Sequence, residues 1–165
     1  MLSKKLEKVL NKQIEKEGYA AQLYLAMASW SEAQGYEGIS NWFYEQHKEE
    51  VEHMLKFIKY MNERGSHATV PKIDQPPKDF AGVKKVFEAS LEHEQMVTRS
   101  INEIVGISLE EKDFTTHNWI QWFVDEQLEE ESSVQNILDK LNLIGDGNLY
   151  MFDRDIMSMR AEGEE

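Results

Sequence analysis

Four stretches of the chain repeat apolar residues every three or four positions, which is the spacing of one helix face. We expect helices over about residues 4–33, 39–64, 83–110 and 115–144, and a short fifth helix over about 148–160. Residues 66–82 show no clear period and contain every proline of the chain. A link of this length can cross the whole bundle. The pattern predicts one all-α domain over 1–165, a four-helix bundle with a long crossover, ending in a frayed tail at 161–165.

Each of the four apolar stripes is interrupted by polar residues near the middle of its helix. In a bundle these interruptions would meet at one level, where an uncompensated carboxylate is costly. If these polar residues only paired with one another, too many carboxylates of like charge would remain close together. We therefore expect a site for two metal ions, with Glu50 placed to bridge them. The residues are Glu17 in the first helix, Glu50 and His53 in the second, Glu94 in the third, and Gln127 and Glu130 in the fourth.

Composition narrows the chemistry of such a site. The chain has no cysteine, so disulfides and thiolate ligands are excluded. Ligands limited to Glu, Asp, His and Gln suit iron, manganese or magnesium better than a structural zinc, and oxygen ligands with a single imidazole suit iron. The net charge of -13 argues against nucleic acid and anionic membranes and favours cations, although acidity can also serve solubility alone. The N-terminus has no signal-peptide pattern and no apolar run is long enough for a membrane helix, so we expect a cytoplasmic protein.

Several short segments resemble the bacterial non-haem ferritins, and the likeness covers nearly the whole chain. They are Glu17, EEVEH at 49–53, LEHEQ at 91–95 and WFVDEQLEEE at 122–131. Many di-iron bundles carry two Glu-x-x-His pairs. Here the second pair is replaced by Gln127 and Glu130, so bacterioferritins and rubrerythrins are less similar. The haem-ligand methionine of bacterioferritin has no counterpart around residues 51–52, and we expect no haem.

The resemblance implies a ferroxidase centre and an iron-storage function. One iron would be held by Glu17, Glu50 and His53, the other by Glu50, Glu94 and Glu130, with Gln127 beside it. A third iron site would use Glu49, Glu126, Glu129 and Glu130, although these residues can also form a solvated acidic face. The family oxidises Fe(II) with O₂ or H₂O₂ and stores a ferric oxyhydroxide mineral. It does so inside a hollow homo-oligomer of twenty-four subunits, with the fifth helix at a fourfold axis.

Other side chains near the predicted centre have less specific interpretations. Tyr24 lies one heptad beyond Glu17, so it can hydrogen-bond a ligand carboxylate, donate an electron, or simply pack in the core. Trp122 is near the same level, and packing is its expected role. The remaining histidines lie off the inward stripes and are expected at the surface: His47, His67, His93 and His117.

Two other functions stay open from the sequence. A di-iron enzyme for an organic substrate would need an apolar pocket, and no residues mark one. A silent bundle that only nucleates mineral or supports assembly should lack several of the ligand-type residues, and this chain has the full set.

Overall fold

The computed structural model describes residues 1–145 and 147–160, and its regular structure there is entirely helical. The predicted tail at 161–165 lies outside the described residues. The helices are α1 (Lys4–Ala33), α2 (Glu37–Glu63), α3 (Val83–Glu110), α4 (Phe114–Ile144) and α5 (Leu149–Arg160). The predicted all-α class is confirmed. The second helix begins at Glu37, two residues before the predicted Ile39, because Glu37 and Gly38 precede the first apolar residue of its stripe.

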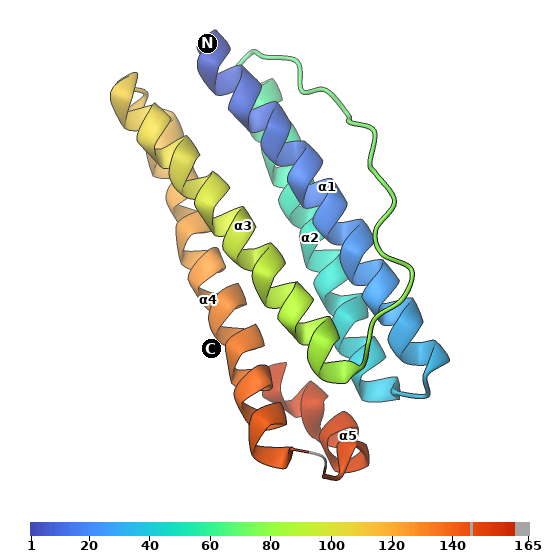
Figure 1. Ribbon diagram of the computed structural model, residues 1–165. Helices are drawn as coiled ribbons and strands as arrows, with labels where there is room; N and C mark the ends of the chain where they lie inside the picture. Colours follow the sequence, from blue (N-terminus) through green and yellow to red (C-terminus); the bar gives the residue numbers. More distant parts are fainter. Residues whose placement is uncertain (146, 161–165) are drawn as a thin grey trace.

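The helices form two antiparallel pairs, α1 with α2 and α3 with α4 (Figure 1). α1 and α4 run in one direction and α2 and α3 in the other. The segment between α2 and α3 runs along the length of the bundle beside α1, so the predicted long crossover is confirmed. α1 also packs against α3. At the end of the bundle α5 folds back and packs against α2 and, less extensively, α4.

Polar contacts fix the helix ends at the opposite end of the bundle. Ser3 caps α1 by accepting a hydrogen bond from the Leu6 amide at 3.1 Å. Asp113 caps α4 by accepting one from the Thr116 amide at 3.0 Å. The same carboxylate pairs with Arg64 at 2.8 Å. The end of α2 is therefore tied to the start of α4.

The apolar core is divided into two clusters along the bundle axis. The α5-side cluster is built around aromatic residues such as Trp42, Phe43 and Phe87. The N-terminal-side cluster contains Phe57 and Phe123, whose ring centroids are 4.3 Å apart. In each of α1 to α4 the residues between the two clusters include buried polar side chains. The core is thus interrupted by one polar layer.

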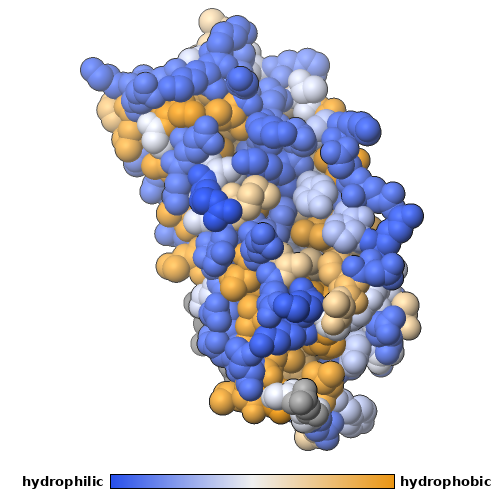
Figure 2. All heavy atoms as spheres, viewed as in Figure 1, coloured by the Kyte–Doolittle hydropathy of each residue, from blue (hydrophilic) through white to orange (hydrophobic). Residues whose placement is uncertain are grey.

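The outer surface is mostly hydrophilic, with apolar patches toward the end where α4 and α5 lie (Figure 2). Exposed apolar residues of these two helices include Leu143 and Tyr150, which are 88% and 73% exposed. Within the described part of the chain, no helix has the length and apolar character needed to cross a membrane.

Candidate metal centre

The polar layer contains all six side chains that the sequence assigned to a two-ion site. Four carboxylates, one imidazole and one amide are buried here, and none is more than 5% exposed. Each lies on the inward stripe of its helix, which is why the fold brings them to one level. They are Glu17 from α1, Glu50 and His53 from α2, Glu94 from α3, and Gln127 and Glu130 from α4.

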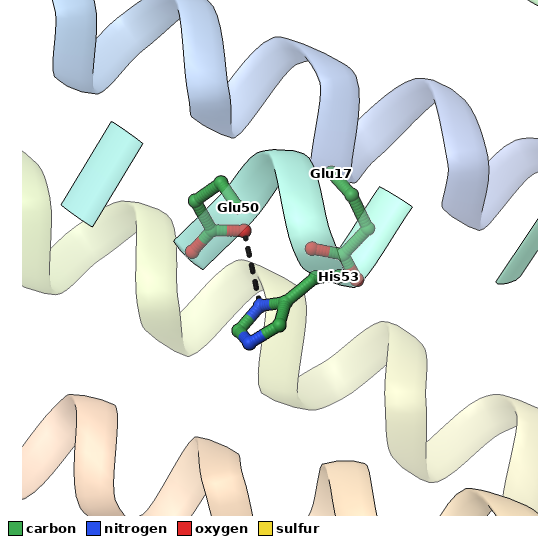
Figure 3. A group of neighbouring side chains, drawn as sticks. All are labelled: Glu17, Glu50 and His53. Carbon is green, nitrogen blue, oxygen red and sulfur yellow. Dashed lines mark ion pairs between the residues drawn. The ribbon is translucent and has the colours of Figure 1, made fainter. Parts of the chain in front are cut away.

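A first group of possible ligands joins α1 and α2. Glu17, Glu50 and His53 offer ligand atoms that all lie within 4.8 Å of one another, and Figure 3 shows the three side chains converging. The Glu50 Oε2 atom is 3.4 Å from His53 Nδ1. Neither this oxygen nor Glu17 Oε2 accepts a hydrogen bond from the residues that the structure describes, although both are buried. Buried carboxylate oxygens without donors are suited to a cation.

A second group joins α2 and α4 and differs from the expected second set. His53, Glu126 and Glu130 offer ligand atoms within 4.8 Å of one another. His53 Nε2 is 3.7 Å from Glu126 Oε1. Glu94 belongs to neither group among the described residues. Its two carboxylate oxygens instead accept hydrogen bonds, one from the Tyr24 hydroxyl and one from Gln127 Nε2 at 3.1 Å.

Three glutamines hold three of these carboxylates. Gln127 binds Glu94, as above, while Gln13 Nε2 donates to Glu17 Oε1 and Gln46 Nε2 donates to Glu130 Oε2, both at 2.7 Å. Sequence reasoning gave a role only to Gln127. The i, i+4 spacing of Gln13 and Glu17 is a local signal that would have found the first pair. The second pair joins α2 to α4 and has no local signal.

Burial makes three carboxyl groups of the polar layer, those of Glu50, Glu94 and Glu130, weaker acids than usual. It raises the pKa of Glu50 and Glu130 well above the usual value, and the charge of Glu94 raises both further. Burial likewise raises the pKa of Glu94 to about 7. In the metal-free protein these groups therefore resist ionisation, because four carboxylates share one layer with few positive charges.

His53 carries the compensating positive charge. Burial alone would lower its pKa, but the nearby carboxylates of Glu126 and Glu50 raise it to about 11. The imidazolium in turn lowers the pKa of the half-buried Glu126. The proton therefore lies on His53 and is paired chiefly with Glu126. A metal ion must release this proton to bind the ring nitrogen.

A groove of about 780 Å³ opens beside Glu130 between α2, α4 and α5. The residues expected to form a third ion site, Glu49, Glu126 and Glu129, line it together with Glu130. Glu129 is exposed, whereas Glu49 and Glu126 are half-buried. The structure thus brings these four acids to one groove, which joins the buried layer to solvent.

A family model described as the ferritin-like domain matches residues 7–144. The chain belongs to the ferritin family. It is 43% identical to a probable bacterial non-heme ferritin-like protein of Haemophilus influenzae, covering 98% of this chain and 99% of that protein. It is 44% identical to a bacterial non-heme ferritin of Campylobacter jejuni, covering 96% of each.

Solved structures show the same relationship. An open pore ferritin from the hyperthermophilic archaeon Archaeoglobus fulgidus superimposes with a TM-score of 0.92. The two proteins are 40% identical, and the match covers 94% of this chain and 96% of the other. The resemblance to bacterial non-haem ferritins that the sequence motifs indicated is confirmed.

Tyr24 of this ferritin belongs to the α5-side cluster and borders the polar layer. Its side chain is fully buried, and its hydroxyl contacts Glu94 and lies 3.0 Å from Ser90 Oγ. Burial and the charge of Glu94 raise the pKa of the phenol well above its usual value. Of the three interpretations of Tyr24, the structure shows the hydrogen bond to a carboxylate of the layer.

The prediction that the other histidines lie at the surface was wrong for His93 of this ferritin. It is only 7% exposed, and its ring centroid is 5.8 Å from that of Tyr19. Burial lowers its pKa to about 4. The prediction failed because α3 packs against both α4 and α1, so two sides of this helix are covered. His67 is exposed, while His47 and His117 are half-buried.

Proposed function

We propose that the chain is an iron-storage subunit that oxidises Fe(II) at a di-iron ferroxidase centre. The oxidant is O₂ or H₂O₂, and the product is stored as a ferric oxyhydroxide mineral. The supporting observation is the buried polar layer, in which four carboxylates and one imidazole converge between two apolar clusters. Oxygen donors favour hard cations, and they favour Fe(III) over Fe(II) because its charge is higher.

In this proposal Glu17, Glu50 and His53 hold one Fe(II) substrate ion, and Glu50 bridges to a second. Glu130 binds the second ion together with Glu94, which exchanges its hydrogen bonds for the metal, and Gln127 remains beside it. His53 gives up its proton as iron binds. Two Fe(II) ions then supply two electrons to one O₂, which takes up two protons to give H₂O₂ and two Fe(III). Pairing the ions avoids one-electron reduction of oxygen.

The ferric product must leave the layer, and the groove beside Glu130 is the route that we propose. Its lining includes five acids together with hydroxyl and amide side chains, which suits the passage of a cation. Glu49, Glu126 and Glu129 would hold a third ion there with Glu130. Tyr24 would serve as an electron donor through its contact with Glu94.

We further propose that the subunit assembles into a hollow homo-oligomer of twenty-four copies in the cytoplasm, without haem. The relatives named bacterial non-heme ferritins support this assignment. So do the exposed apolar residues near the end of α4 and in α5, such as Leu143 and Tyr150, because apolar surface of this kind marks protein contacts. The acidic composition fits a container for cations.

The decisive experiment follows iron uptake in the assembled protein. The metal-free protein is loaded with Fe(II) without oxygen, oxygen is admitted, and ferric absorbance is recorded at increasing iron per subunit. We expect a fast phase at low loading and continued uptake far beyond three ions. Saturation at two ions, or the absence of a fast phase, would refute the storage function or the oxidation respectively.

A variant pair tests the bridging residue. Glu50→Ala should abolish the fast phase while leaving assembly intact, because it removes a shared ligand and a buried acid. Glu52→Ala removes the same side chain from an exposed position on the same helix and should oxidise iron normally. Fast oxidation in Glu50→Ala would contradict the bridging role.

A further inference from the structure

Arg160, at the end of α5, reaches back to the polar layer. Its guanidinium donates to Gln46 Oε1 and to Glu49 Oε1, both on α2. The side chain is only 15% exposed although it is charged. It lines the groove beside Glu130. A positive charge of this chain therefore lies among the acids expected to bind a third iron.

The packing of α5 explains why Arg160 lies there. Phe152, Ile156 and Arg160 are four residues apart, so they share one face of the helix. The first two are buried in the α5-side cluster. Asp153 anchors the helix to α2 by accepting a hydrogen bond from the Ile39 amide at 2.8 Å. The buried face of α5 thus ends in the cationic side chain of Arg160, which lies against α2.

The contact to Gln46 connects Arg160 to the inner centre. Gln46 accepts from Arg160 with its carbonyl and donates to Glu130 with its amide nitrogen at 2.7 Å. Because these roles use different atoms, the guanidinium fixes which way the amide faces. A guanidinium holds two acceptors in a fixed geometry, so the contact to Glu49 and the orientation of Gln46 depend on one side chain.

We propose that Arg160 is a positioning residue that occupies the outer acidic site until a metal ion displaces it. The third ion must compete with the guanidinium for Glu49, so the site binds iron weakly. Displacement also frees Gln46 to turn and release Glu130. Weak binding at the outer site lets product pass on instead of remaining there. This inference rests on the proposed third site, but it assigns a role to a residue outside the ligand set.

The test measures metal affinity without redox chemistry. Zinc binding to the assembled, metal-free protein is followed by calorimetry, which separates tight inner binding from weak outer binding. In Arg160→Ala the outer affinity should rise roughly tenfold, because a charge-assisted contact at a poorly exposed carboxylate no longer competes. Arg154→Ala removes the same charge from an exposed position of α5, where Arg154 pairs with Asp155, and should change outer affinity little.

Two further variants keep the test decisive. Arg160→Lys retains the charge but loses the fork, so its outer affinity should lie between those of the wild type and Arg160→Ala, and it replaces Arg160→Ala if that variant does not assemble. Removing Arg160 in a Glu49→Gln background should give no gain, because the contested ligand is absent. Equal affinities in Arg160→Ala and Arg154→Ala would overturn the inference. Absence of tight zinc binding in the wild type would instead refute the proposed centre.

Discussion

Replacing Glu94 by glutamine should stabilise the metal-free protein at high pH and lower its affinity for metal ions. Burial raises the pKa of this fully buried carboxyl from its ordinary 4.5 to about 7. At about 1.4 kcal/mol for each tenfold change in proton affinity, ionised Glu94 costs the fold about 3 kcal/mol. Glutamine avoids this cost but must pair again with the amide of Gln127, which costs about 1 kcal/mol. The net gain is about 2 kcal/mol.

The direction in which stability changes with pH follows from this pKa shift. The folded-state pKa is raised, so the folded protein holds this proton between pH 4.5 and about 7 whereas the unfolded chain does not. The stability of the wild type therefore falls as pH rises through that window and is lowest above it. Glu94→Gln has no proton to lose there. Its advantage should be small at pH 5 and full at pH 8.

Calorimetric melting of the metal-free protein checks this prediction. At pH 8 the melting temperature of Glu94→Gln should exceed that of the wild type by roughly 5 °C. Glu92→Gln, an exposed neutral replacement on the same helix, is the matched control. Added zinc should reverse the order, because a ligand stabilises the form that binds it more tightly. A loss of stability at pH 8, or an equal gain at both pH values, would refute the assignment of Glu94 as a buried, destabilising acid.

Three other perturbations probe separate parts of the molecule. Tyr24→Phe removes the hydroxyl that contacts the α3 carboxylate; zinc stoichiometry should be unchanged while the fast oxidation phase slows several-fold, and an unaltered rate would leave only a packing role. Asp113→Ala should cost about 2 kcal/mol in denaturant unfolding through the lost cap and ion pair, and Asp113→Asn less, because asparagine still caps. The pKa of Asp113 is lowered from its ordinary 3.8, so the stability lost in Asp113→Ala should become smaller as pH falls below 3.8. Gly38→Ala would place a Cβ 1.8 Å from the Asp153 carbonyl oxygen, so hydrogen exchange in α5 should accelerate; unchanged protection would show that the helix can shift at no cost.

The helices and the inner polar residues were predictable because each depends on one local pattern. Glu17, Glu50 and Glu94 interrupt regular apolar stripes, and the stripes fix both the helix and the face that turns inward. Once four such helices pack, the interruptions must meet. The resemblance to ferritins came separately, from short sequence motifs that include these residues.

Contacts between helices could not be predicted in the same way. His93 lies off the main stripe, and only the side-by-side packing of α1 and α3 buries it. Glu126 approaches His53 because α2 and α4 face each other across the layer, which no spacing within α4 reveals. The place of Arg160 depends on how α5 packs against α2. In each case the deciding distance joins elements that are far apart in the sequence.

The division of the core into two apolar clusters has a consequence for a protein that takes up and releases cargo. Each half of the bundle has its own hydrophobic packing, so neither half relies on ions for its cohesion. Binding or loss of ions changes the charge and protonation of the polar layer, while the apolar clusters on either side of it keep the helices packed. The fold therefore does not depend on whether the polar layer holds ions. A subunit that has lost its ions can bind new ones without refolding.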